Sequence, residues 1–200
     1  MTADPHAPAR FPSLVSDLPL TRSALEFASA HHEGQRREAD SAPFILHPLE
    51  VAQLLRARGY GDEVIAAAAL HDVVEDTDVE PAELEQRFGR TVARLVEVLT
   101  EPSSDGSYRE RKARLRAAVA GAGEDALVIF AADKVAKVRE MRMALAGGRI
   151  DEPDPDKLEH YEACLELLEA RLPGHSLVLQ LRFELETLEL LPPEARRQSS

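Results

Sequence analysis

Cysteine, tryptophan and long apolar runs are scarce in this chain of 200 residues. It has one cysteine, Cys164, and no tryptophan, so it can form neither an internal disulfide nor a metal site built from several thiolates. No stretch is apolar over the roughly 20 residues that a membrane-spanning helix needs, and none has the pattern of a signal peptide. These absences predict a cytoplasmic protein with no membrane partner.

Positive charge is also in the minority. The chain has 24 Lys and Arg residues against 36 Asp and Glu residues, a formal net charge of −12. Nucleic-acid binding depends on many Lys and Arg side chains that neutralise phosphates, so this balance argues against a nucleic-acid partner. A small phosphorylated ligand in a local basic pocket is still compatible with it.

The pattern of apolar residues predicts an all-α protein, because no segment has the alternation typical of a strand. We expect a disordered N-terminal arm over residues 1–20, a helical domain over residues 21–146, C-terminal helices over residues 147–192 that pack on the same domain, and a flexible tail over residues 193–200. The helices are predicted at residues 23–34, 49–58, 62–76, 81–88, 91–100, from 107, 124–146, 156–171 and 176–191. The oligomeric state is left open.

The segment Val64–Asp76, VIAAAALHDVVED, predicts a buried central helix. Its first half is apolar on every side, so it has no solvent face, and Asp62 is placed to cap it. The apolar half is followed by His71, Asp72, Glu75 and Asp76. Burying these ionisable side chains without partners would cost several kcal/mol of folding free energy. A divalent ion would satisfy an adjacent His and Asp, and this ligand pair favours manganese, iron or zinc over magnesium or calcium.

Asp133 interrupts the apolar run Leu127–Ala132 in the same way, so it is a candidate third ligand of the ion. His31 and His32 lie about 100° apart at the end of the first helix, so we expect only one of them to point inward. Spacing does not choose between them. His47 precedes the second helix, where capping or packing is as reasonable as chemistry.

Local positive charge occurs at two places that phosphate binding could use. Arg36 and Arg37 form either a solvated turn or a phosphate clamp. The basic helix that starts at Ser107 presents either a solvated face or a cationic wall over a cleft.

Several short motifs follow one another in a characteristic order. They are His32-Glu-Gly-Gln35, Pro43-Phe-Ile-Leu-His-Pro48, Ala67-Ala-Ala-Leu-His-Asp-Val-Val-Glu-Asp-Thr77, Phe88-Gly89, Glu110-Arg-Lys112 and Ala132-Asp-Lys134. Over Ser23 to Met141 this set resembles the HD-superfamily hydrolase domain of the RelA/SpoT type, in particular the small single-domain guanosine tetraphosphate hydrolases. The resemblance implies an HD-domain helical bundle.

The resemblance also implies a set of functional residues. The metal, usually manganese in that family, would be held by His32, His71, Asp72 and Asp133. The preference for His32 over His31 rests on this resemblance. The family's Glu-Asp pair, which assists water attack and the departure of pyrophosphate from the 3′ position, falls on Glu75 and Asp76.

The chain departs from the family pattern on the substrate side. After Gln35-Arg-Arg37 the family commonly has a basic residue and then a glycine before the Pro-aromatic pair, whereas this chain has Glu38-Ala-Asp-Ser-Ala42. Lys137 stands at a position that is usually Asn, and Glu140 at a position that is usually Thr. A carboxylate in place of a cation weakens phosphate binding.

The sequence therefore predicts a manganese-dependent phosphohydrolase that acts on a small phosphorylated nucleotide. The candidates for phosphate contact are Arg36, Arg37, Lys134 and Lys137. One alternative is a different nucleotide phosphatase or pyrophosphohydrolase on the same metal site. Another is a catalytically silent nucleotide-binding regulatory domain.

Overall fold

The computed structural model describes residues 17–101 and 105–191. Within these residues the chain forms ten helices and no strand, and the one β-type contact is an isolated bridge between Arg36 and Pro43. The prediction of an all-α protein is confirmed. Most of the expected N-terminal arm and the expected C-terminal tail lie outside the described residues.

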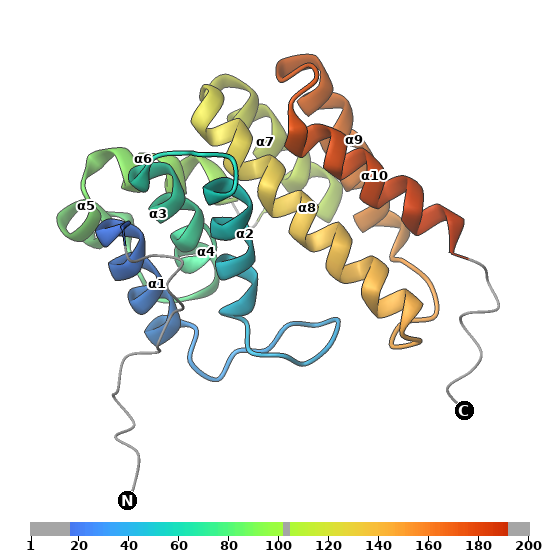
Figure 1. The fold of residues 1–200 in the computed structure, drawn as a ribbon, viewed down its shortest axis with the longest axis horizontal. Coiled ribbons are helices and arrows are strands. Elements are labelled where there is room, and N and C mark those ends of the chain that lie inside the picture. Colours follow the sequence, from blue (N-terminus) through green and yellow to red (C-terminus); the bar gives the residue numbers. More distant parts are fainter. Residues whose placement is uncertain (1–16, 102–104, 192–200) are drawn as a thin grey trace, which may run out of the picture.

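A buried helix, α3, is at the centre of the N-terminal half. The helices of this half are α1 (Pro19–His31), α2 (Leu46–Arg56), α3 (Asp62–Leu70), α4 (Val73–Asp76), α5 (Pro81–Phe88) and α6 (Arg90–Leu99). Every residue from Val64 to Leu70 is buried, and α3 packs against α1, α2, α6 and α8. A helix without a polar face can be accommodated only in such a position, so the expected central helix is present (Figure 1).

The first helix begins earlier than its capping-box sequence predicts. The expected start was Ser23, but α1 starts at Pro19, whose fixed φ suits the first turn of a helix. Asp62, expected to cap its own helix, instead accepts hydrogen bonds from the backbone N–H groups of Leu20 and Thr21 at 2.9 and 2.8 Å. This carboxylate therefore caps α1 from another helix.

The central helix breaks before the acidic residues that follow it. It ends at Leu70, His71 and Asp72 form a turn, and the short helix α4 starts at Val73. The imidazole Nδ1 of His71 donates to the carbonyl of Ala68 at 2.7 Å. The two parallel stripes that an uninterrupted helix would present are therefore not formed.

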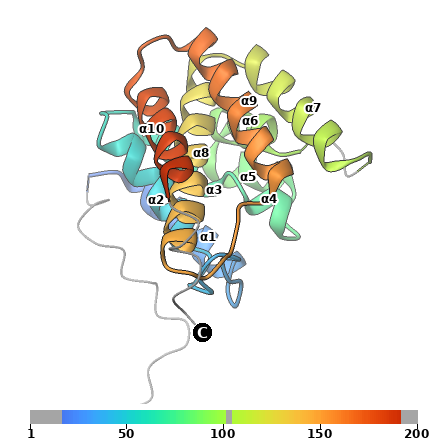
Figure 2. The ribbon, with the colours of Figure 1, turned by 90° about the vertical axis from the view of Figure 1, so that its right-hand side faces the viewer.

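The C-terminal half is built on the long helix α8. Its helices are α7 (Tyr108–Gly121), α8 (Glu124–Ala146), α9 (Pro155–Arg171) and α10 (Ser176–Leu190). The capping box of Ser107 and Glu110 is present at the start of α7. Helix α8 is buried over residues 126–136 and lies between the N-terminal helices and the pair α9 and α10, which pack against it (Figures 1 and 2). None of the helices in the described part of the chain is long and apolar enough to cross a membrane.

Candidate metal centre

Four side chains from three places in the fold converge on one buried point. His47 lies in the first turn of α2, His71 and Asp72 form the turn after α3, and Asp133 projects from α8. Their exposed fractions are between 2% and 7%. Asp133 Oδ1 lies 3.1 Å from His47 Nε2 and 3.5 Å from His71 Nε2, and Asp72 Oδ2 lies 3.4 and 3.1 Å from the same two nitrogen atoms.

These separations fit a shared metal ion. Bonds of about 2.0–2.2 Å from one ion to nitrogen and oxygen ligands place neighbouring ligand atoms roughly 3.0–3.5 Å apart. Asp72 Oδ2 and Asp133 Oδ1 are buried and make no hydrogen bond within the described residues, and the ammonium of Lys137 lies 3.2 Å from Asp133 Oδ1. Burial of such oxygens is costly unless cations compensate them. Imidazole nitrogen with carboxylate oxygen is the donor set of a divalent transition metal. The residues present therefore fit such an ion.

Neighbouring groups orient two of the four ligand atoms. The hydrogen bond from His71 Nδ1 to Ala68 leaves Nε2 of the ring available as a ligand. Lys134 donates from Nζ to Asp133 Oδ2 at 2.6 Å, which leaves Oδ1 facing the histidines. Lys134 is 4% exposed, so this predicted substrate contact supports a candidate metal ligand as well as lining the pocket.

His32 lies close to the cluster but outside the group of converging atoms. His32 is buried and His31 is exposed, so only one of the two histidines points inward, as expected. Its Nδ1 donates to Gln35 Oε1 at 2.7 Å, while its Nε2 is buried and has no hydrogen-bond partner in the described chain. Among those residues the group able to hold a metal is His47, His71 and Asp133. The geometry thus favours His47, and the assignment of His32 as a ligand stays a prediction.

The charges of the cluster perturb its protonation. Burial lowers the pKa of His71, but the charges of Asp72 and Asp133 outweigh it and raise that pKa to about 10. Burial opposes ionisation of the two aspartates, yet the adjacent cations hold both carboxyl pKa values well below the usual range. The pKa of His47 is lowered, chiefly by burial. One of the two histidines is therefore protonated and the other neutral when no metal is bound.

The predicted catalytic pair lies beside this cluster, at the end of α4. Partial desolvation, together with the charges of Asp72 and Glu75, raises the pKa of Asp76 to about 6. Glu75 accepts a hydrogen bond at 3.3 Å from the backbone N–H of Glu101. Both carboxylates are exposed, so water and substrate can reach them.

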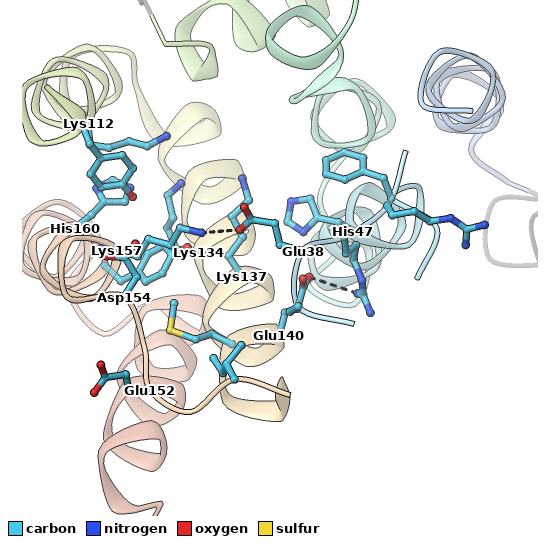
Figure 3. Close-up of a pocket in the computed structure, with 18 residues that line it drawn as sticks. Glu38, His47, Lys112, Lys134, Lys137, Glu140, Glu152, Asp154, Lys157 and His160 are labelled. Carbon is cyan, nitrogen blue, oxygen red and sulfur yellow. Dashed lines mark hydrogen bonds and ion pairs between the residues drawn. The ribbon is translucent and has the colours of Figure 1, made fainter. Parts of the chain in front are cut away.

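A cavity of about 460 Å³ opens at the cluster, with His47 in its wall (Figure 3). The cations that line it are Arg36, Arg37, Lys112, Lys134, Lys137 and Lys157, and the acids are Glu38, Glu140, Glu152 and Asp154. Two ion pairs within this lining join Glu38 to Lys157 at 2.6 Å and Glu140 to Arg37 at 3.5 Å. All four predicted phosphate contacts therefore line one cavity, together with acidic residues.

Some lining residues were not identified from the sequence. For His47 the sequence leaves capping, packing and chemistry open, and the structure places this residue at the cluster. Tyr108 and the α9 residues Lys157, His160 and Tyr161 also line the cavity. No motif marked the α9 residues, because only the packing of α9 beside α8 brings them to the site.

Comparison with known proteins shows which family has a similar sequence. The model of the HD domain family matches residues 24–148. The chain is 35% identical over 127 residues to the guanosine-3′,5′-bis(diphosphate) 3′-pyrophosphohydrolase MESH1 of zebrafish, covering 62% of this chain and 70% of that protein. It is 40% identical over 107 residues to the guanosine-3′,5′-bis(diphosphate) 3′-pyrophosphohydrolase of Aquifex aeolicus, covering 54% of this chain but only 15% of that longer protein.

A solved structure extends the similarity over nearly the whole chain. It is that of a metazoan ortholog of SpoT described as hydrolysing ppGpp, and it matches with a TM-score of 0.71 and 26% identity, covering 92% of this chain and 100% of that one. The family model, the zebrafish relative and the shared helical fold agree with one another. This chain belongs to the HD domain family.

Proposed function

We propose that this protein is a metal-dependent phosphohydrolase that releases pyrophosphate from the 3′ position of guanosine tetraphosphate or a closely related nucleotide. The observation that carries the proposal is the convergence of two imidazoles and two carboxylates at 3.1–3.5 Å beside a cation-lined cavity. Relatives named for this reaction support the choice of substrate. A cytoplasmic location is part of the proposal, because a single cysteine is typical of a reducing compartment.

We assign the metal to His47, His71, Asp72 and Asp133, with manganese as the preferred ion. When bound, the ion would lower the pKa of water and stabilise negative charge that develops on phosphorus. His32 remains a predicted ligand, supported by its buried Nε2 atom without a hydrogen-bond partner.

The chain's own groups would handle protons and phosphate. Asp76, with a pKa of about 6, is suited to accept a proton near neutral pH, and Glu75 is its acidic neighbour on the same helix. Lys137 projects from α8 into the cavity (Figure 3), where it can contact a phosphate close to the metal ligands. Arg36, Arg37 and Lys134 are the other proposed phosphate contacts.

The proposal is tested by metal content and product release from one sample. Mass spectrometry of the purified protein should find a divalent transition metal, and the manganese-loaded protein should release pyrophosphate from guanosine tetraphosphate. Asp72→Ala should abolish release while the helical circular-dichroism spectrum is retained. A protein that binds no metal, or an Asp72→Ala variant of full activity, would contradict the proposal.

A second candidate keeps the chemistry and changes the substrate. Glu38 and Glu140 both line the cavity and occupy positions where a basic residue and a threonine are usual in the family that the sequence resembles. These acids favour a nucleotide with less negative charge than guanosine tetraphosphate. Release from another nucleotide alone would establish this candidate, and tight nucleotide binding without any release would indicate a regulatory domain.

A further inference from the structure

Lys137 contacts the same carboxylate oxygen that faces the two histidines. Its Nζ lies 3.2 Å from Asp133 Oδ1 and 3.7 Å from Asp72 Oδ1. Asp133 Oδ1 is also the atom 3.1 Å from His47 Nε2. An ion held by the histidines and aspartates would therefore share this oxygen with an ammonium group.

The position of Lys137 along α8 explains this contact. It follows Asp133 by four residues, so both side chains lie on one face of the helix. The lysine side chain is 35% exposed, whereas the aspartate is 6% exposed. Lys137 thus reaches from the buried carboxylates into the cavity, where a phosphate would approach (Figure 3).

The charges of the cluster show what this lysine changes. Lys134 already pairs with the other oxygen of Asp133 at 2.6 Å. With Lys137 present, two ammonium groups lie against the two aspartates before any ion binds. A divalent cation entering this site meets a neighbouring positive charge, which weakens its binding and makes the loaded site more attractive to an anion.

We propose that Lys137 is an internal counter-ion that competes with the divalent metal for Asp133. Through this competition the binding of metal and the binding of phosphate are thermodynamically coupled. In the metal-free protein Lys137 pairs with both aspartates. When metal and a phosphorylated ligand are both bound, the ammonium turns from Asp133 to the phosphate. By linkage, a phosphate that engages Lys137 strengthens metal binding by the same factor as the metal strengthens phosphate binding. The inference rests on the metal site of the proposed function.

The direct test is the affinity of the purified protein for Mn²⁺ alone, measured from the free-ion signal in electron paramagnetic resonance. Lys137→Gln should bind Mn²⁺ at least about tenfold more tightly than the unmutated protein. Lys137→Arg keeps the charge and should stay within a few-fold of it. Lys157→Gln removes a lysine from the same cavity, but one that pairs with Glu38, so its Mn²⁺ affinity should not change.

Thermal unfolding gives a readout that is independent of turnover. In the presence of a chelator, Lys137→Gln should unfold at a lower temperature than the unmutated protein. Addition of Mn²⁺ should raise the unfolding midpoint of Lys137→Gln by more than it raises that of the unmutated protein. Unchanged or weaker Mn²⁺ binding by Lys137→Gln would overturn the inference while leaving the metal site in place. Absence of Mn²⁺ binding by the unmutated protein and by every variant would overturn both the inference and the proposed function.

Discussion

The Nε2 atoms of His47 and His71 lie 3.2 Å apart in a buried site. Only one of them can donate in a direct hydrogen bond, and each is also within 3.5 Å of both Asp72 and Asp133. One cation between the two rings satisfies all four groups at once. This relationship distinguishes His47 from His32, whose ring nitrogens are not among the atoms that converge within the described residues.

We therefore expect His47 to matter more than His32 for metal binding. His47→Ala should lower Mn²⁺ affinity by about two orders of magnitude or more, because a ligand atom is lost. His32→Ala should lower it by much less. Titration of both variants with Mn²⁺ checks this order. The reverse order would assign the ligand role to His32 and leave His47 with a packing role.

Metal binding should strengthen as pH rises. The pKa of His71 is about 10, and a metal can bind its Nε2 only after the proton has left. Below pH 10 each unit of pH decrease should therefore weaken Mn²⁺ binding about tenfold. Calorimetry in two buffers of different ionisation enthalpy should detect about one proton released per ion at pH 7. Affinity that does not change between pH 6.5 and 8.5 would contradict the protonated state of His71.

The sequence predicted the parts of this site that depend on local pattern. The bounds of α8 followed from its apolar run and from Gly147 at its end, and Asp133 was recognisable because it interrupts that run. The His-Asp pair that follows α3 was recognisable for the same reason. Burial is encoded locally, so such acids can be identified without a structure.

Contacts between distant residues could not be predicted in this way. Asp62 contacts Leu20 and Thr21, about forty residues earlier, and no local pattern distinguishes this contact from capping of its own helix. The break at His71 was equally hidden, because nothing in the segment forbids helix. His47 reaches Asp133 only through the packing of α2 on α8.

Activity should follow the ionisation of Asp76. Its pKa of about 6 lies above the ordinary aspartate value, and a group that accepts a proton must be ionised. At saturating Mn²⁺, whose charge lowers this pKa, the value of kcat/KM should therefore rise with pH and reach its plateau by about pH 7. Asp76→Asn should lower the plateau by about two to four orders of magnitude and remove the rise. Glu75→Gln is the control: it should retain the rise, shifted to lower pH because the charge of Glu75 helps to raise the pKa of Asp76.

Asp62 should stabilise the fold through α1 rather than α3. Asp62→Ala removes the acceptor for the N–H groups of Leu20 and Thr21 and for the hydroxyl of Thr21. Loss of such a cap costs about 1–2 kcal/mol, which lowers the unfolding midpoint of a protein of this size by about 2–8 °C. Thr21→Val leaves the two backbone bonds in place and should cost less. Equal stability of Asp62→Ala and the unmutated protein would contradict the capping role.

Substrate affinity should increase when Glu140 is neutralised. Its carboxylate lies 3.5 Å from Arg37 in the wall of the cavity. Asp40 also pairs with Arg37, so Glu140 adds a second negative charge beside this cation and repels an incoming phosphate. Glu140→Gln should lower the KM for guanosine tetraphosphate several-fold and leave kcat nearly unchanged, because the carboxylate is not one of the groups proposed to handle protons. Glu152→Gln, at the other end of the same cavity (Figure 3), should have a smaller effect that disappears at high salt. A higher KM in Glu140→Gln would mean that Arg37 depends on Glu140 for its position, and that the acid serves substrate binding instead of opposing it.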